Sequence, residues 1–217
     1  MKDSAIILSG GMDSVTMLYD RQKEIELAIT FDYGSNHAKK EIECAKWHCN
    51  KLNIEHIIIE LPFIHKHFDS SLLKGGNAIP TGPYNNHNIT STVVHFRNGI
   101  MLSIAAGLAE SKGLQNLLIA NHFGDHAIYP DCTLKFIKSM SDAIANGTYR
   151  HIHINAPYTM LSKIDIAKIG GKLNIDYSKT YSCYKGGEKH CGECATCIER
   201  KEAFVKAGIK DTTEYFN

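Results

Sequence analysis

The segment Ser9-Gly10-Gly11-Met12-Asp13-Ser14 combines residue types that suit phosphate binding. It follows the apolar run 5–8, so we expect a buried strand to end here and a helix to begin with Asp13 and Ser14 in its first turn. Glycines let backbone N–H groups approach a ligand closely, and the N-terminus of a helix favours an anion. The sequence therefore predicts a phosphate-binding loop at a strand-to-helix turn, and hence a nucleotide ligand.

This loop differs from the two commonest nucleotide-binding motifs. No lysine follows the glycines as in a Walker P-loop, and the glycine spacing does not fit the dinucleotide fingerprint. A lone pair of glycines would also suit an ordinary structural turn, but the serine before the pair and the Asp-Ser after it favour a ligand. Ser-Gly-Gly-x-Asp-Ser resembles the pyrophosphate loop of the ATP pyrophosphatases. Those enzymes split ATP into AMP and pyrophosphate to activate an oxygen for replacement by nitrogen or sulfur.

Four of the seven cysteines lie near the C-terminus in a C-x7-C-x2-C-x2-C pattern: Cys183, Cys191, Cys194 and Cys197. Two-residue spacers let neighbouring thiolates reach one tetrahedral ion, and four thiolates leave no open position, so we predict a structural zinc site. An iron–sulfur cluster also uses four cysteines and is the alternative. His190 is a further candidate ligand. The other cysteines, at 44, 49 and 132, are expected to be small buried side chains.

Length and composition indicate one domain, with room for a small appendage. The chain has 217 residues, of which 43% are hydrophobic, enough for a sizeable core. Its net charge of +1 argues against a nucleic-acid-wrapping surface or a polybasic membrane patch, so we expect no direct nucleic-acid binding. The N-terminal apolar run is too short for a signal peptide, and no apolar stretch approaches the roughly 20 residues of a membrane span. These features predict a cytoplasmic protein.

Apolar, β-branched runs alternate with helical patterns along the chain. The predicted strands are 5–8, 27–31, 57–61, 117–120 and, more weakly, 151–155. The predicted helices are 14–21, 36–52, 97–111, 134–145 and 163–173. This alternation predicts a doubly wound α/β fold, in which ligands bind at the carboxyl ends of parallel strands. The phosphate loop, the turn 31–34 and the segment 121–131 follow such ends, so we expect them to meet in one crevice.

The segment 66–92 interrupts this alternation. It contains Pro80, Pro83 and several glycine and asparagine residues. A connection of this length is usually functional or mobile. We predict that it is a lid over the crevice, with a surface insertion of no function as the alternative.

Four motifs, spread over nearly the whole chain, make the resemblance more specific. They are Leu8-Ser-Gly-Gly-Met-Asp-Ser14, Phe31-Asp-Tyr-Gly34 with His37 close behind, Arg97-Asn98, and Tyr129-Pro-Asp-Cys132 followed by Lys163 and Ser182-Cys-Tyr-Lys-Gly186. Together they resemble the 7-cyano-7-deazaguanine synthase family, ligases that make the nitrile precursor of queuosine and related deazaguanines. The resemblance implies a Rossmann-like, HUP-type domain with a five-stranded parallel sheet over 1–180. It also implies a zinc-binding segment with a C-terminal helix over 181–217, and a homodimer.

The resemblance also implies a two-stage reaction. ATP would adenylate the carboxylate of 7-carboxy-7-deazaguanine, and ammonia would displace AMP to give an amide. A second ATP would activate the amide oxygen, whose loss leaves the nitrile. The implied ATP-binding residues are Leu8, Ser9, Gly10, Gly11, Met12, Asp13, Ser14, Phe31 and Tyr33.

Three implied catalytic residues have roles that their chemistry explains. Asp13 would bind Mg²⁺ between itself and the phosphates, because an acid in an anion site makes little sense alone. Lys163 would neutralise charge on the phosphates, and Arg97 would pair with a carboxylate or phosphate. Taken without the resemblance, a solvated lysine and a capping or surface arginine remain the alternatives.

The implied substrate contacts, besides Arg97, are Asn98, Asp125, Tyr129 and Asp131. Tyr129 would stack on the base, and the Asp131 carboxylate would accept hydrogen bonds from the guanine-like N1–H and amino groups. Residues of a turn around Pro130 are the alternative for both.

Two stretches depart from the family pattern. Val94-His95-Phe96 stands where a Val-Pro-Gly or Val-Pro-Met tripeptide commonly precedes the Arg-Asn pair, so we expect Phe96 to add bulk near the substrate. The stretch 121–126 replaces a Cys-Glu-Thr-Asp type sequence, and we align Asp125 with the family aspartate. His122 and His126 are expected to be solvated or hydrogen-bonded rather than metal ligands.

These departures leave a second function open, in which the deazaguanine acyl group is transferred to another amine, such as one on a protein. A sulfur-transferring tRNA enzyme would need a reactive cysteine pair and a basic RNA surface, and the four-thiolate set and the net charge argue against it. The presence of Asp13, Arg97 and Lys163 argues against a nucleotide-binding module without catalysis.

Overall fold

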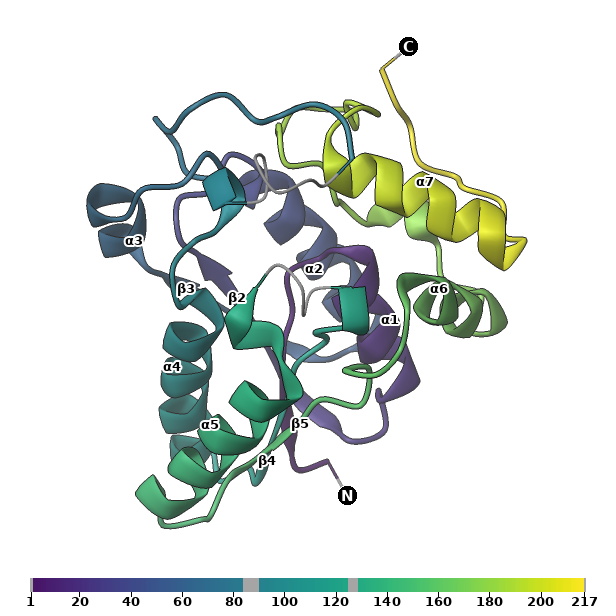
Figure 1. The fold of residues 1–217 in the computed structure, drawn as a ribbon. Coiled ribbons are helices and arrows are strands. Elements are labelled where there is room, and N and C mark those ends of the chain that lie inside the picture. The colour runs from purple at the N-terminus through teal and green to yellow at the C-terminus, as the bar shows by residue number, and fades with distance from the viewer. Residues whose placement is uncertain (1, 84–89, 125–128, 217) are drawn as a thin grey trace.

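The computed structural model describes residues 2–83, 90–124 and 129–216. Its centre is a five-stranded sheet in which every neighbouring pair is parallel, in the order β3-β2-β1-β4-β5 (Figure 1). The strands are β1 (Ser4–Ile7), β2 (Ile25–Asp32), β3 (Glu55–Glu60), β4 (Asn116–Leu118) and β5 (His153–Asn155). The order reverses between β1 and β4, which confirms the predicted doubly wound, Rossmann-like fold.

The middle strands are covered on both faces. Ala5 and Ile6 in β1 have no exposed surface and belong to apolar clusters on opposite sides of the sheet. A strand buried in this way needs a near-continuous apolar sequence, and this is why the runs 5–8 and 27–31 could be recognised. The fourth and fifth strands are shorter than predicted, since each spans three residues.

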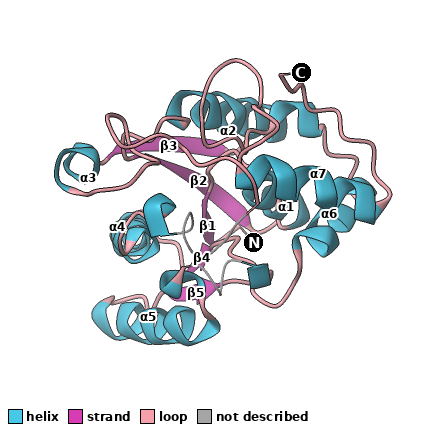
Figure 2. Cartoon of the chain, turned by 45° about the horizontal axis from the view of Figure 1, so that its top comes forward, coloured by secondary structure: helices cyan, strands magenta, loops and turns pink. Residues whose placement is uncertain are grey.

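Two layers of helices cover the sheet (Figure 2). The helices in the described part of the chain are α1 (Met12–Asp20), α2 (Ala38–Leu52), α3 (Pro62–His67), α4 (Arg97–Ser111), α5 (Leu134–Gly147), α6 (Lys163–Lys172) and α7 (Ala195–Ala207). Helices α3, α4 and α5 pack on one face, and α1, α2, α6 and α7 pack on the other. The predicted helices are confirmed to within a few residues, whereas α3 matches no predicted helix.

A capping box fixes the start of α6. The Ser162 hydroxyl accepts the Asp165 N–H, and the Asp165 carboxylate accepts the Ser162 N–H. Each side chain thereby satisfies an amide that the first turn of a helix leaves free. Lys163 is consequently the first residue of α6, a position from which its side chain reaches the carboxyl edge of the sheet.

The described part of the segment 66–92 packs against the core near its middle. Leu72 and Leu73 are buried in the cluster under α4, and the Leu72 carbonyl accepts the Asn36 N–H. The Ser71 N–H donates to the Ser91 carbonyl, so the two limbs of the segment run close together. Residues 84–89 lie outside the described residues. A lid role for this segment therefore stays a prediction.

Residues 181–216 fold back onto the helical layer. The Arg200 side chain on α7 is fully buried and donates to Thr213 Oγ1, Ser182 Oγ and the Tyr177 carbonyl oxygen. A buried guanidinium needs an acceptor for each of its N–H donors. These bonds therefore join α7 to the stretch before Cys183 and to the C-terminal tail. A domain boundary at residue 180 stays a prediction, and the contacts across it are extensive.

One segment in the described residues, Thr90–Ser111, is long and apolar enough by length and composition to cross a membrane. This finding corrects the expectation that no stretch approaches that length. Helix α4 forms most of the segment, and 44% of its most apolar 18-residue stretch is buried inside the fold. Leu102 and Ala105 of this helix lie in the core. The apolar composition of α4 is therefore accounted for by its place in the fold.

Burial of His48 predicts an acid-sensitive fold. His48 on α2 has no exposed surface, and its ring nitrogens contact the Tyr19 hydroxyl and the Lys179 carbonyl. Burial lowers the pKa of His48 from 6.5 to about 4. The folded state thus favours the neutral ring, so its stability is complete above pH 6.5 and declines as the pH falls toward 4.

We expect His48 to account for about 2 kcal/mol of the loss in unfolding free energy between pH 7.5 and pH 5. The measurement is urea unfolding of the wild type and of His48→Gln at both pH values, with exposed His67→Gln as the matched control. The variant should lose less stability on acidification than the wild type and the control do. Equal losses in all three proteins would contradict this assignment.

Candidate functional site

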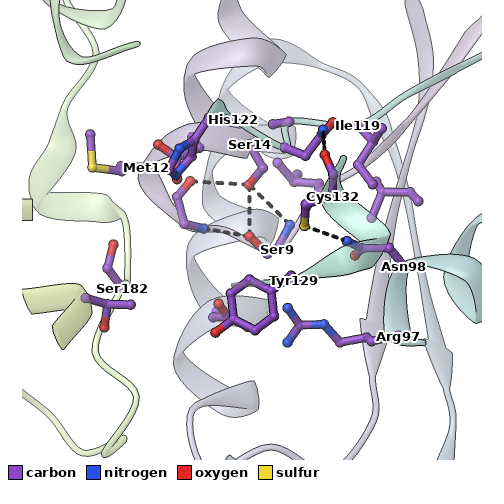
Figure 3. A pocket seen from close by; sticks show the side chains of 18 of the residues that line it. Ser9, Met12, Ser14, Arg97, Asn98, Ile119, His122, Tyr129, Cys132 and Ser182 are labelled. Atoms are coloured by element: carbon purple, nitrogen blue, oxygen red, sulfur yellow. Dashed lines mark hydrogen bonds and ion pairs between the residues drawn. The ribbon is translucent and has the colours of Figure 1, made fainter. Parts of the chain in front are cut away.

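A cavity of ≈230 Å³ opens at the carboxyl ends of β1, β2 and β4, where the strand order reverses (Figure 3). Most of the predicted site residues line it: Leu8, Ser9, Gly11, Met12, Asp13, Ser14, Phe31, Tyr33, Arg97, Asn98, Tyr129 and Lys163. Gly10 and Asp131 do not line it, and Asp125 lies outside the described residues. Three loops that are far apart in the sequence thus meet in one crevice.

The predicted phosphate loop joins β1 to α1 and is held by its two serines. Ser9 Oγ lies 3.0 Å from Ser14 Oγ and accepts the Gly11 N–H at 3.1 Å. No hydrogen bond among the described residues uses the amides of Met12, Asp13 and Ser14, as expected for the first turn of a helix. These free amides and the two hydroxyls face the cavity and form a site suited to an anion.

Gly10 allows the loop to pack closely against α2. Its φ of +86° is a left-handed conformation, and an added Cβ would collide with the Glu41 carbonyl oxygen of α2. The Gly10 carbonyl accepts the Tyr181 N–H at 3.0 Å, so the stretch before the cysteines braces the loop. Gly10 therefore lets the loop press onto α2, and its part in the site is structural.

Asp13 and Lys163 meet at the mouth of this loop. Asp13 Oδ2 lies 3.5 Å from Lys163 Nζ and 3.8 Å from His122 Nε2. Lys163 Nζ also contacts Glu199 Oε2 on α7 at 2.7 Å. Asp13 Oδ1 is buried, and no hydrogen bond to it occurs in the described residues. A carboxylate oxygen left unpaired beside an anion site fits a hard cation such as Mg²⁺, so Asp13 would hold such a cation, whose charge would offset that of phosphate.

Arg97 begins α4 on the far side of the cavity. Its Nη1 donates to the Tyr33 hydroxyl at 2.9 Å, and its guanidinium carbon lies 5.4 Å from the Tyr33 ring centroid. Tyr129 and Tyr184 stand beside it, with 3.5 Å between their hydroxyl oxygens. Figure 3 shows the guanidinium pointing toward the Tyr129 ring. A cation among aromatic faces is a good site for a flat, anionic ligand.

Asp131 has a positioning contact instead of a place in the cavity. Its Oδ2 accepts the Asn98 N–H at 2.9 Å, and its carbonyl accepts from the Asn98 side-chain amide. Asn98 also donates to Cys132 Sγ at 3.2 Å. The turn 130–132 therefore caps the first turn of α4 and sets the position of Arg97.

Phe96 points away from the cavity, which corrects the expectation that it adds bulk near the substrate. It is 57% exposed, does not line the cavity and packs edge-on against Phe136, with ring centroids 5.8 Å apart. Its φ of +54° is left-handed, and its ring covers Gly99 in the first turn of α4. The aromatic side chain of this tripeptide therefore lies on the outside of the turn, away from the cavity wall.

Several lining residues were not predicted as site residues: His37, Glu41, His122, Ser182, Tyr184 and Glu199. His122 was expected to be solvated or hydrogen-bonded. It is only 2% exposed, and its Nδ1 accepts the Gly124 N–H. A signal for Glu41 was present, since His37 and Glu41 are four apart at the start of a helix and so share one face. For Glu199 there was no such signal, because only the packing of α7 on α6 places it beside Lys163.

The four predicted zinc ligands converge. The sulfurs of Cys183, Cys191, Cys194 and Cys197 all lie within 4.8 Å of one another, and 3.9 Å separates those of Cys191 and Cys197. A tetrahedral zinc with bonds of ~2.3 Å holds its sulfurs about 3.8 Å apart, so these residues fit a single zinc ion. An iron–sulfur cluster would need more space between the sulfurs. His190 is not part of this converging set, and its Nε2 accepts the Ser182 N–H.

Comparisons with known proteins find similar sequences over nearly the whole chain. The model of the family described as queuosine biosynthesis protein QueC matches residues 3–208. A protein named 7-cyano-7-deazaguanine synthase from Porphyromonas gingivalis is 58% identical over 214 residues, covering 99% of this chain and 97% of that protein. The protein of that name from Desulfotalea psychrophila is 49% identical and covers 99% of both chains.

A solved structure supports the fold alone. NMN synthetase from Francisella tularensis superposes with a TM-score of 0.51 over 97% of this chain and 79% of that one, at 13% identity.

The cysteine geometry predicts one zinc ion per chain, measured by elemental analysis and native mass spectrometry. Cys194→Ser should lose the metal and at least about 3 kcal/mol of unfolding free energy, because binding of a structural zinc is coupled to folding. Cys44→Ser is the matched control, since this cysteine packs beside the cluster without joining the ligand set. Iron in place of zinc, or full zinc content in Cys194→Ser, would contradict the assignment.

Proposed function

Because the chain belongs to the queuosine biosynthesis protein QueC family, we propose that it is an ATP-dependent ligase that converts 7-carboxy-7-deazaguanine into 7-cyano-7-deazaguanine. Ammonia is the nitrogen donor in this proposal, and the amide is the intermediate. The observation that carries it is the position of an anion-binding loop and an arginine on opposite sides of one cavity. That arrangement can hold ATP and a carboxylate together.

The chemistry explains why both groups are needed. A carboxylate is a poor electrophile because its leaving group would be oxide. Attack of its oxygen on the α-phosphorus of ATP forms a C–O–P linkage and releases pyrophosphate. Ammonia then adds to the carbon, AMP departs with the oxygen, and the amide forms. Repetition at the amide oxygen, with loss of the remaining N–H protons, gives the nitrile, a second AMP and a second pyrophosphate.

Each half of the cavity has a distinct task in this scheme. The free amides of α1 and the hydroxyls of Ser9 and Ser14 hold the departing pyrophosphate. Lys163, placed by Asp13 and Glu199, stabilises the negative charge that develops on the phosphates. Arg97 holds the carboxylate in position for attack, with Tyr33 fixing the guanidinium. Tyr129 would stack on the deazaguanine ring.

Asp13 is the residue that would hold Mg²⁺. Its buried and unpaired Oδ1 supports this assignment. The cation would screen the phosphate charge and orient ATP when bound. The zinc site takes no part in the chemistry in this proposal. It fixes the N-terminus of α7 and thereby Glu199, which contacts Lys163.

The alternative acceptor, an amine on another molecule, gains no support from the relatives. The tripeptide 94–96 motivated it, and Phe96 lies on the outside of the turn. Ammonia therefore remains the donor in this proposal. A homodimer and a cytoplasmic location also stay predictions.

The direct test is incubation with 7-carboxy-7-deazaguanine, ATP, Mg²⁺ and ammonium, followed by mass spectrometry. We expect the nitrile to accumulate with two AMP and two pyrophosphate per nitrile, and the amide to appear transiently. Omission of ammonium should leave the acyl-adenylate. A reaction that stops at the amide with ammonium present, or the absence of any adenylate, would contradict the proposed function.

Lys163→Ala should lower kcat/KM for pyrophosphate release by about 100-fold, because it removes a fixed positive charge from the phosphates. Lys168→Ala on the exposed side of the same helix is the matched control and should retain wild-type activity. The measurement is a coupled pyrophosphate assay in both variants. Equal activities in the two variants would show that Lys163 is dispensable.

A further inference from the structure

Three carboxylates line the cavity in the described residues: Asp13, Glu41 and Glu199. Asp13 and Glu199 both contact Lys163, so they belong to the phosphate end. Glu41 on α2 contacts neither of them. It is the carboxylate that the proposed reaction leaves without a role.

The substrate in the proposed function requires a carboxylate of this kind. A guanine-like ring presents an N1–H and an exocyclic amino group side by side, and these two donors match the two oxygens of one carboxylate. Asp131 was predicted to supply those oxygens. Its Oδ2 instead accepts the Asn98 N–H, and the residue lies outside the cavity lining. The guanine-like edge therefore needs another acceptor.

Glu41 has unused hydrogen-bonding capacity. Its side chain is 18% exposed, and His37 Nε2 lies 3.6 Å from its Oε2, beyond hydrogen-bond distance. Arg97 forms no ion pair with it in the described structure. Burial raises the pKa of Glu41 to about 8, against the opposing effect of Arg97, so the protonated acid predominates near pH 7 until donors reach it. Two N–H donors from a bound ring would favour the charged carboxylate, because hydrogen bonds to the charged form lower the pKa of a carboxyl group. Burial and the charge of Arg97 lower the pKa of His37 to about 4, so the ring is neutral and does not compensate the carboxylate.

Flat aromatic side chains line the same cavity as Glu41. Tyr33, Tyr129 and Tyr184 line it together with His37, whose ring centroid is 5.6 Å from that of Tyr184. Such faces stack on heteroaromatic rings without reading their edges. Reading the edge requires a polar acceptor, and among the described carboxylates that line the cavity Glu41 is the one that does not contact Lys163.

We propose that Glu41 is the specificity-determining residue for the base, accepting hydrogen bonds from the N1–H and the exocyclic amino group of the deazaguanine ring. The inference rests on the proposed function and adds the residue that selects the substrate. His37, the residue that precedes α2, lies beside the Glu41 side chain. The ring lies among the tyrosines, and its carboxylate substituent is held by Arg97.

The test is a cycle of two proteins and two substrates. Wild type and Glu41→Gln are assayed for pyrophosphate release with 7-carboxy-7-deazaguanine and with its analogue lacking the 2-amino group. Loss of the amino group should lower kcat/KM about 10- to 100-fold in the wild type, because the buried carboxylate loses a donor. The same change should cost Glu41→Gln less than about 3-fold. The effect should fall on the KM for the base, with the KM for ATP unchanged.

Two further variants sharpen the result. Glu43→Gln, on the same helix with a half-exposed side chain, is the matched control and should discriminate as the wild type does. Glu41→Asp keeps the carboxylate, so it should retain the preference for the amino group with a raised KM for the base. This variant keeps the inference testable if Glu41→Gln fails to fold. Full discrimination by Glu41→Gln, or a change confined to the KM for ammonium, would overturn the inference. Failure of the proposed function can be distinguished from failure of this inference, because the wild type would then release no pyrophosphate with 7-carboxy-7-deazaguanine.

Discussion

The contact on which the site depends is that of Lys163 with two carboxylates from distant parts of the chain. Its Nζ lies 2.7 Å from Glu199 Oε2 on α7 and 3.5 Å from Asp13 Oδ2 on α1. The side chain is only 12% exposed, so its charge must be compensated locally. The contact joins the first turns of α1 and α6 to α7, and it holds a cation where phosphate would bind.

This dependence gives the cysteine segment a place in the site. The four sulfurs surround one point at the start of α7, and Glu199 follows Cys197 by two residues on that helix. Tyr181, from the stretch before the first cysteine, braces Gly10 of the phosphate loop. A structural zinc would therefore maintain the positions of Lys163 and of the loop without touching either ligand.

The opposite wall combines Arg97 with aromatic side chains. Arg97 is oriented by Tyr33, and the first turn of α4 is capped by Asp131. The two walls differ in chemical character. In the proposed function, one wall binds the phosphates and a cation, and the other binds a flat ring that carries a carboxylate. An oxygen of that carboxylate would then lie within reach of the α-phosphorus.

The sequence by itself determined the features that arise from local chemistry. Buried strands need continuous apolar runs, so the fold class could be recognised. Gly10 is required where the backbone is left-handed, which marked the loop. Closely spaced cysteines reach one ion, which identified the predicted metal ligands. Only the tertiary structure decided which polar side chains face the cavity. Asp131 faces a helix terminus and Phe96 faces outward, whereas Glu41 and Glu199 face inward. The reason is that the direction of a side chain depends on how helices from separate parts of the chain pack together, and a local pattern does not record that packing.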